Sequence, residues 1–286
     1  MDGRCGRRTL AGEVTLKDVG LFSSVPVAMR LRPAEAGRGV VFVRTDVGGV
    51  EIPALVSRAV DQPRRTALAA AGRPEVTVET VEHVLSAVSG LGVTDVVIAL
   101  DAAEVPSFDG SSLAFVEAIG RVGLVDLEGE LEPLVVTERV EVLEGDSRVV
   151  VEPLAAGEGP SLSYDLDYGD HPVLKAGRAV YRGGVDDYGA EVAPARTFVL
   201  EAEAEALQAM GLGKHLTAAT LVVFGVGGVL PPNELRFADE PVRHKLLDLM
   251  GDLSLAGRPI VGRVSAWKSG HALNRRMAGR LLEVFG

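Results

Sequence analysis

The chain has 286 residues, of which 47% are hydrophobic and 24% are charged, a composition typical of a folded globular protein and not of a disordered one. The formal net charge of −11 at pH 7 disfavours binding to the phosphate backbone of nucleic acids. The single cysteine, Cys5, excludes an intrachain disulfide and a cysteine-rich zinc site.

No segment of the sequence predicts export or insertion into a membrane. The residues from Met1 to Leu10 are basic, but no apolar run follows them, so they do not resemble a signal peptide. The most apolar stretch, from Thr220 to Leu230, is too short and too rich in glycine to span a bilayer. We therefore expect a cytoplasmic protein without a transmembrane segment.

The first half of the chain predicts strands followed by helix, strand and helix. Alternating apolar and β-branched residues predict strands at 9–16, 25–31, 40–44 and 95–100. Thr80 is expected to cap a helix that Gly90 ends, and Ser111 or Ser112 is expected to cap a second helix that ends at Gly120.

The second half repeats this order of elements. The acidic segment 125–133, which contains Gly129 and Pro133, is expected to be a linker. Beyond it, strands are predicted at 134–142, 148–152, 161–167, 219–224 and 259–268. Helices are predicted at 202–210, 241–255 and 272–285. The repeated order predicts an α+β protein of two similar domains, residues 1–126 and 133–286.

His244 and Asp248 are four residues apart in a predicted helix, so their side chains share one face. An imidazole and a carboxylate at this spacing can both ligate one divalent cation. The alternative interpretation is a solvent-exposed helix face that carries a chance His–Asp pair.

Two further histidines have neighbours that suit catalysis. Glu82 directly precedes His83 at a predicted helix start, where it can take a proton from a metal-bound water. Alternatively, Glu82 only stabilises the positive end of the helix dipole. His271 lies between a predicted strand and a predicted helix and can reach a pocket there, or it is only a residue near a helix N-cap. His171 and His215 fall in connections and are expected to be structural or surface residues.

Short motifs follow one another along nearly the whole chain. In the first half they are Thr80-Val81-Glu82-His83, Glu104-Val105-Pro106 and Asp109-Gly110-Ser111. In the second half they are Ala195-Arg196-Thr197-Phe198, Leu235-Arg236-Phe237, Asp239-Glu240, Val242-Arg243-His244-Lys245, Asp248, Gly251-Asp252 and Lys268-Ser269-Gly270-His271-Ala272-Leu273-Asn274. In this order, they resemble the UDP-3-O-acyl-N-acetylglucosamine deacetylases, which carry out the committed step of lipid A synthesis in Gram-negative bacteria.

The resemblance implies a fold and a metal centre. The fold has two α+β domains, each a sheet packed against a pair of helices, with the active site between them. His83, His244 and Asp248 are implied to ligate zinc, with a water molecule in the fourth position. Iron(II) also accepts this ligand set.

The resemblance also implies roles for the remaining site residues. Glu82 matches the general base, and His271 matches the residue that stabilises the oxyanion and protonates the leaving amine. Asp252 matches the carboxylate that orients His271, and Thr197 matches a hydroxyl that donates to the oxyanion. The positions that line the sugar and diphosphate pocket are matched by Phe198, Lys245 and Lys268.

The implied activity is zinc-dependent hydrolysis of the N-acetyl amide of an acylated UDP-sugar, UDP-3-O-acyl-N-acetylglucosamine, with release of acetate. An amide is a poor electrophile and water is a poor nucleophile. Zinc addresses the second problem, because it can lower the pKa of a bound water from about 15.7 to about 7.

Two segments depart from the family pattern. Phe22 stands where the family usually has a histidine, and Lys214 to Thr220 replace a Gly-Gly-Ser turn and an Asp-Asn pair. These departures leave two alternatives open. One is a divergent zinc amidohydrolase that acts on another N-acetyl sugar conjugate, and the other is a non-catalytic, metal-stabilised binding protein.

Overall fold

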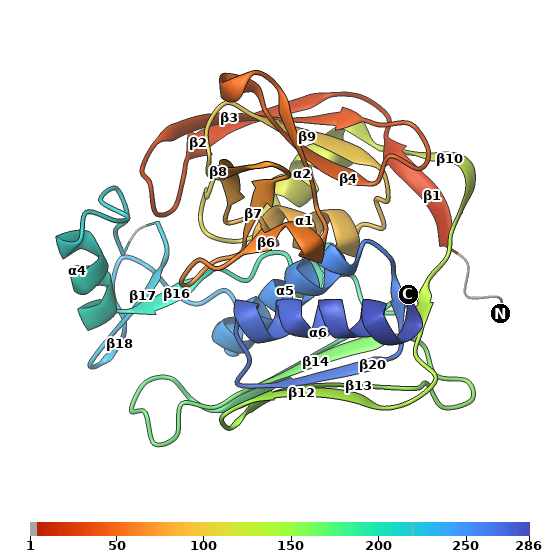
Figure 1. Ribbon diagram of the computed structural model, residues 1–286. Coiled ribbons are helices and arrows are strands. Elements are labelled where there is room, and N and C mark those ends of the chain that lie inside the picture. Colours follow the sequence, from red (N-terminus) through yellow and green to blue (C-terminus); the bar gives the residue numbers. More distant parts are fainter. Residues whose placement is uncertain (1–4, 219) are drawn as a thin grey trace.

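Two five-stranded sheets form the outer layers of the fold, and the main helices lie between them (Figure 1). The computed structural model describes residues 5–218 and 220–286. The first four residues of the basic N-terminal segment, and Ala219 at the start of one predicted strand, lie outside the described residues. The arrangement confirms the predicted α+β class.

The first sheet is built from alternating buried and exposed positions. Its strands are β2 (Val14–Val19), β3 (Pro26–Pro33), β4 (Val40–Arg44), β5 (Val50–Pro53) and β9 (Val96–Leu100). Along β3, Val27, Met29 and Leu31 are buried while Arg30 between them is exposed, as the two-residue period of a strand requires. The strand order is β2-β3-β9-β4-β5, and β9 is parallel to β4 alone.

The second sheet has the same topology. Its strands are β12 (Val140–Glu144), β13 (Ser147–Glu152), β14 (Ser161–Leu166), β15 (Gly177–Arg182) and β20 (Arg263–Trp267). The order is β12-β13-β20-β14-β15, and β20 is parallel to β14 alone. In both sheets the last strand in the chain therefore lies third in space, between the second and the third. This identity supports the prediction of two similar halves.

Two pairs of helices fill the space between the sheets. They are α1 (Glu82–Gly90), α2 (Leu113–Val122), α5 (Glu240–Leu253) and α6 (His271–Phe285). In each half, one helix precedes the last strand of the sheet and the other follows it. α1 packs directly against α5, and a Cβ atom at Gly251 would overlap the backbone carbonyl of Glu82. The absence of a side chain at Gly251 lets the two helix backbones approach closely.

The two halves differ in what joins the fourth strand to the first helix. In the first half this connection contains a 3₁₀ turn, η2 (Val56–Arg58), and a small antiparallel sheet of β6 (Ala59–Val60), β7 (Ala67–Ala70) and β8 (Arg73–Glu79). Another 3₁₀ turn, η1 (Thr45–Val47), joins β4 to β5. The second half contains α3 (Tyr188–Glu191), β16 (Phe198–Leu200), α4 (Glu201–Ala209), β17 (Val222–Gly225) and β18 (Gly228–Val229). The unit formed by β16, α4, β17 and β18 projects from one side of the molecule (Figure 1).

The segment expected to be a linker is instead largely a strand. β10 (Leu124–Leu131) pairs antiparallel with β1 (Cys5–Leu10), and an ion pair of 3.0 Å between Arg7 and Asp95 fixes β1 to the first half. The backbone hydrogen bonds of this ladder satisfy a segment whose acidic, glycine-containing sequence suggested a flexible connection. The remaining short elements are β11 (Leu134–Val135), β19 (Ile260–Val261) and η3 (Ser254–Ala256).

Two local predictions in the first half were wrong. The expected strand 9–16 is divided between β1 and β2. Thr80 does not cap α1, because it adopts a left-handed φ of 57° and its hydroxyl donates to Glu104 Oε1 at 2.8 Å. The helix therefore begins at Glu82 without a side-chain cap.

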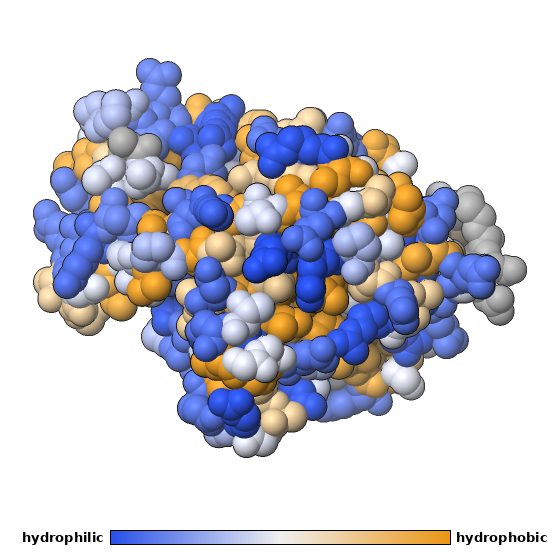
Figure 2. Space-filling view, turned by 90° about the horizontal axis from the view of Figure 1, so that it is seen from above, coloured by the Kyte–Doolittle hydropathy of each residue, from blue (hydrophilic) through white to orange (hydrophobic). Residues whose placement is uncertain are grey.

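The outer face of the first half, seen from above, is a mixture of hydrophilic and hydrophobic side chains (Figure 2). In the described part of the chain, no helix has both the length and the apolar character that crossing a membrane requires.

Candidate metal centre and active site

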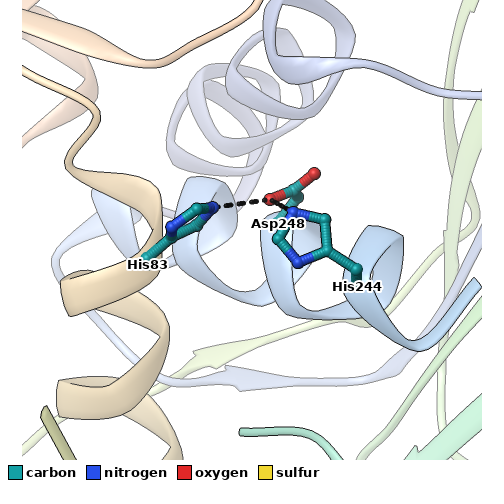
Figure 3. Close-up of side chains that lie close together, drawn as sticks. All are labelled: His83, His244 and Asp248. Atoms are coloured by element: carbon teal, nitrogen blue, oxygen red, sulfur yellow. Dashed lines mark ion pairs between the residues drawn. The ribbon is translucent and has the colours of Figure 1, made fainter. Parts of the chain in front are cut away.

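Three buried side chains from the two halves converge between α1 and α5 (Figure 3). His83 comes from α1, and His244 and Asp248 come from one face of α5. Asp248 Oδ1 lies 3.6 Å from His83 Nε2 and 3.4 Å from His244 Nε2. One ligand atom of each residue lies within 4.8 Å of the others, so the three could hold a single metal ion.

The chemistry of this cluster fits a divalent cation. Asp248 Oδ1 is buried and has no hydrogen-bond partner among the described residues, whereas Oδ2 accepts from Lys245 Nζ at 2.5 Å. His244 Nδ1 lies 3.1 Å from the carbonyl oxygen of Ala195, which leaves Nε2 directed at Asp248. Burial lowers the pKa of His244 to about 3, so the ring is neutral at pH 7, the form that binds a metal. Two imidazole nitrogens and one carboxylate oxygen are typical zinc ligands.

Glu82 and His271 lie beside this cluster and face each other. Glu82 Oε1 is 3.9 Å from His271 Nε2, and His271 Nδ1 is 2.9 Å from Asp252 Oδ2. Burial raises the pKa of Glu82, although the nearby His271 and His83 partly oppose the shift. Burial alone would lower the pKa of His271, but Asp252 and Glu82 outweigh it and raise that pKa to about 9. The imidazole of His271 is therefore protonated at pH 7, and it faces a carboxyl group of increased basicity.

Two residues that sequence reasoning did not single out hold the carboxylates in place. Thr66 donates its backbone N–H to Glu82 Oε2 at 3.0 Å and its hydroxyl to Asp252 Oδ1 at 2.5 Å. Asn274 donates its side-chain amide to Asp252 Oδ2 at 2.9 Å. Asn274 lies three residues after His271 on the same face of α6, a spacing that could have indicated it. No local signal marks Thr66.

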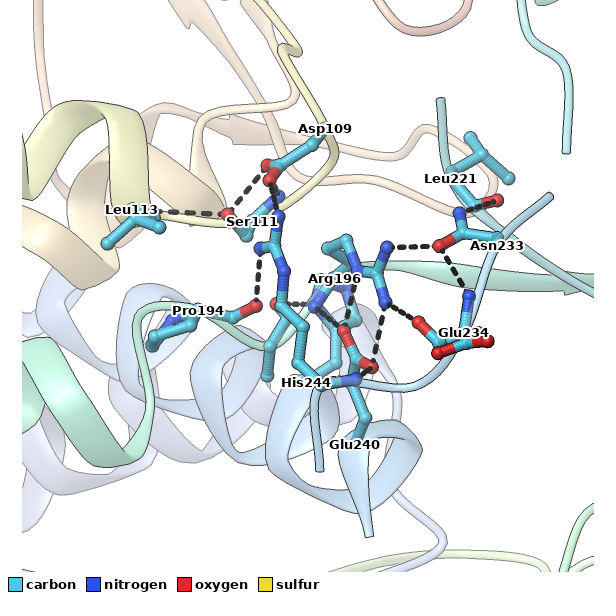
Figure 4. Close-up of polar contacts among 12 residues, drawn as sticks. Asp109, Ser111, Leu113, Pro194, Arg196, Leu221, Asn233, Glu234, Glu240 and His244 are labelled. Atoms are coloured by element: carbon cyan, nitrogen blue, oxygen red, sulfur yellow. Dashed lines mark hydrogen bonds and ion pairs between the residues drawn. The ribbon is translucent and has the colours of Figure 1, made fainter. Parts of the chain in front are cut away.

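A buried ion pair supports the other side of His244. Figure 4 shows the Arg196 guanidinium between Asn233 and Glu240. Arg196 Nε is 2.8 Å from Glu240 Oε1, and the backbone N–H of Arg196 donates to the same oxygen at 3.0 Å. Because Ala195 precedes Arg196, this clamp fixes the carbonyl group that faces His244 Nδ1. A partner of this kind sets the orientation and tautomer of a metal-binding histidine.

The metal cluster opens into a cavity of about 810 Å³. Glu82 and His271 line the cavity beside the cluster, and so does Lys245, whose Nζ binds Asp248. Thr197 and Phe198 also line the cavity. Its far part is bounded mainly by apolar residues of the projecting unit and of the first half, among them Leu21, Phe22, Val199, Leu212, Leu221 and Val223. The cavity thus has a polar end at the metal cluster and an apolar end beside α4, where polar side chains of α4 also line it: Glu201, Glu203, Glu205 and Gln208.

The structure separates two predicted site residues from the cavity surface. Asp252 lies behind His271 and is fully buried. Lys268 does not line the cavity, and its Nζ is 3.0 Å from the exposed carboxylate of Asp146. The two lysines of the predicted pocket therefore have different surroundings, and only Lys245 reaches the cavity.

The two departing segments lie next to each other in the fold. The backbone N–H of Gly213 donates to the carbonyl of Phe22 at 2.8 Å, and Ser24 Oγ is 2.8 Å from His215 Nδ1. Phe22 also packs in the apolar cluster that includes Leu216. Segments that depart from the family pattern separately in sequence thus form one part of the cavity wall.

Comparison with known proteins agrees with this geometry. Residues 7–283 match the family model described as UDP-3-O-acyl N-acetylglycosamine deacetylase. The UDP-3-O-acyl-N-acetylglucosamine deacetylase of Myxococcus xanthus is 39% identical over 277 residues, covering 96% of this chain and 86% of the relative. The protein of that name from Leptospira biflexa is 38% identical over 275 residues, covering 95% and 88%. The chain belongs to the UDP-3-O-acyl N-acetylglycosamine deacetylase family.

Proposed function

We propose that this protein is a metal-dependent deacetylase that hydrolyses the N-acetyl amide of UDP-3-O-acyl-N-acetylglucosamine, releasing acetate, in lipid A biosynthesis. The observation that carries the proposal is the buried cluster of His83, His244 and Asp248, with Glu82 and His271 beside it, at the polar end of a partly apolar cavity. The names of the relatives support the choice of substrate.

Three finer assignments belong to the same proposal. The metal ion is zinc, because two imidazoles and one carboxylate form a ligand set that zinc prefers and that leaves a coordination position open. The protein acts in the cytoplasm. Residues 1–126 and 133–286 act as two domains that share one active site.

A divalent cation held by the three ligands would acidify a water molecule and polarise the carbonyl group of the amide. Glu82 then accepts the proton of the attacking water. Burial suits it to this task, because the raised pKa makes its carboxylate a stronger base. The bond from the Thr66 amide to Oε2 leaves Oε1 directed at the cavity.

His271 carries the proton that the leaving amine needs. Its raised pKa keeps the imidazole protonated at neutral pH, and Asp252 holds Nδ1 so that Nε2 faces the reacting groups. The positive charge also stabilises the oxyanion that forms during attack. Thr197 lines the same end of the cavity, and its hydroxyl is assigned as a second donor to the oxyanion.

The shape of the cavity suits a substrate with a polar and an apolar part. Phe198 and Lys245 are assigned to the sugar and diphosphate, which would bring positive charge into an acidic protein. The acyl chain is assigned to the apolar wall beside α4, where its burial would contribute about 0.8 kcal/mol per methylene group.

The proposal is tested by measuring acetate release from UDP-3-O-acyl-N-acetylglucosamine and from unacylated UDP-N-acetylglucosamine, with metal content determined on the same sample. We expect turnover of the acylated substrate, stoichiometric zinc, and loss of turnover in Glu82→Ala with the metal retained. Binding of the acylated sugar without turnover would instead indicate a non-catalytic binding protein.

A second candidate is a divergent amidohydrolase that acts on another N-acetyl sugar conjugate. The contact between Phe22 and the 213–216 segment favours it, because the cavity wall there differs from the family pattern. Turnover of other N-acetyl sugar conjugates, combined with no activity on the acylated nucleotide sugar, would support this candidate.

A further inference from the structure

We propose that Thr66 is a positioning residue that couples the general base to the general acid. Its backbone amide orients Glu82, and its hydroxyl orients Asp252 and, through it, His271. This inference rests on the proposed function, because it assigns Thr66 a role in the same reaction.

Thr66 lies between the two carboxylates, which come from different halves of the molecule. It is fully buried and immediately precedes β7, a strand of the small sheet that distinguishes the first half. Its carbonyl accepts the backbone N–H of Val81 at 3.3 Å, directly before α1 begins. Its amide binds Glu82 Oε2 at 3.0 Å, so the position of Glu82 depends on the backbone at Thr66.

The hydroxyl group completes the environment of Asp252. Oδ2 of this fully buried carboxylate receives His271 Nδ1 and Asn274 Nδ2, each at 2.9 Å. Oδ1 receives the Thr66 hydroxyl at 2.5 Å. Donors at both oxygens prevent the carboxylate from rotating about its Cβ–Cγ bond. Loss of the Thr66 donor would leave a buried charge with an unsatisfied oxygen and a His271 ring with a less firmly held partner.

A neighbouring arginine determines the direction of the hydroxyl bond. Arg275 Nη1 approaches Thr66 Oγ1 at 3.5 Å, and Arg275 Nη2 lies 3.2 Å from Asp61 Oδ1. A guanidinium group only donates, so the threonine oxygen accepts on that side. The single hydroxyl proton is then available to Asp252, which only accepts when ionised. The contacts therefore assign Thr66 as the donor to Asp252.

The test compares substitutions that separate the hydroxyl from the rest of the side chain. Thr66→Ser keeps the oxygen, Thr66→Ala removes it, and Thr66→Val replaces it at nearly constant shape. We expect the Ala and Val variants to lose roughly 10-fold to 100-fold in kcat, with KM and bound zinc unchanged, and the Ser variant to stay near the unsubstituted enzyme. Thr9→Val is the matched control, because it removes a buried hydroxyl that binds the Ala34 amide outside the site.

Equal kcat values for Thr66→Ser and Thr66→Ala would overturn the inference. A lower kcat in Thr66→Ser together with an unchanged kcat in Thr66→Val would also overturn it. A second measurement does not depend on turnover. In the unsubstituted protein, NMR should detect a slowly exchanging Thr66 hydroxyl proton and a downfield His271 Nδ1 proton. Absence of the hydroxyl signal would overturn the inference even if the Ala and Val variants fail to fold. An unsubstituted protein without deacetylase activity that shows both signals would contradict the proposed function but not the hydrogen-bonded arrangement.

Discussion

The two halves of the molecule share one scaffold but divide the chemistry unequally. Each half has a five-stranded sheet of the same strand order and a helix on either side of its last strand. α1 and α5 hold equivalent positions, yet α1 supplies His83 and Glu82, whereas α5 supplies His244, Asp248 and Asp252. The two halves are thus equivalent in the positions of their helices but differ in the site side chains that those helices carry.

The connecting segments carry the second difference. In the first half, a small sheet places Thr66 against both catalytic carboxylates. In the second half, the unit of β16, α4, β17 and β18 follows Thr197, which lines the cavity, and this unit builds the apolar end of the cavity. The repeated sheets thus provide a common frame, while the residues proposed to determine the reaction and the substrate lie on the helices and in the inserted segments.

The largest expected effect comes from removing Glu82, the proposed proton acceptor, which the first half supplies. We expect Glu82→Gln to lower kcat by about 10²- to 10⁴-fold, because an amide cannot accept the proton of the attacking water. The three metal ligands remain, so bound zinc should not change. Turnover and metal content measured on one sample check both statements, and Glu75→Gln, an exposed acid, is the control. Near-normal turnover in the Glu82 variant would show that the first half does not provide the base.

A smaller effect is expected from the clamp in the second half. Glu240 now accepts the Arg196 guanidinium on both carboxylate oxygens and the Arg236 backbone N–H on Oε2, whereas Glu240→Gln leaves only one acceptor oxygen. The Ala195 carbonyl would be held less firmly, and we expect zinc affinity to fall by roughly 10-fold to 100-fold. Chelator competition with the metal-free protein measures this change directly. Glu191→Gln, which alters an exposed partner of Arg243, is the control. If the Glu240 and Glu191 variants bound zinc with equal affinity, the Arg196–Glu240 pair would not contribute to metal binding.

His271, which lies where the two halves meet, is expected to make activity depend on pH, because only its protonated form can act as the acid. The pKa of His271 is raised to about 9, so the acid form persists at neutral pH and is lost as the pH rises through about 9. We therefore expect kcat/KM, which reports the ionisation of the free enzyme, to fall to half near pH 9 on the basic side of its profile. The same group stabilises the fold below its unfolded value of 6.5, and that contribution is lost as the pH rises through about 9. In Asp252→Asn the fall of activity at basic pH should begin at lower pH, because Asp252 is a main cause of the raised pKa of His271. If the fall stayed at the same pH, a group other than His271 would cause it.

The smallest effect is expected where the two inserted regions touch at the surface. Arg64, near the small sheet, is 3.0 Å from Glu203 on α4, and both side chains are substantially exposed. Solvent screens such a pair, so Arg64→Ala should change the free energy of unfolding by less than about 1 kcal/mol. Denaturant titration measures this value, and a double-mutant cycle with Glu203→Ala isolates the pair. A coupling well above that limit would mean that the inserted regions also stabilise the frame.

The elements that could be predicted from sequence were those with a strong periodic pattern. α5 and α6 were predicted to within one or two residues of their observed ends, because apolar residues recur along one face of each helix. β6, β7 and β8 were not predicted. The Ala67–Ala70 strand is rich in alanine, which has little strand propensity, and it forms only because its neighbours bury it.

The candidate site divides in the same way. The spacing of His244 and Asp248 suggested a metal site, and the resemblance to the deacetylase family added His83, so the three ligands could be proposed before the fold was known. The structure brings the three together. Thr66 carries no such signal, since its contacts depend on residues 16 and 186 positions away. Lys268 shows the converse case, in which a residue close to the site in sequence does not line the cavity. It stands three residues before His271, but a left-handed φ of 51° and the pair with Asp146 direct its side chain elsewhere.

The absence of a side chain at Gly251 links the affinity of the metal centre to the distance between α1 and α5. One proposed ligand comes from α1 and two come from α5, and these helices approach closely because Gly251 leaves room for the Glu82 carbonyl. Zinc tolerates bond lengths within only about 0.2 Å of their normal values. A larger distance between α1 and α5 should therefore lower the affinity for the metal. Even the smallest enlargement, Gly251→Ala, would be detected as zinc loss before the protein unfolds.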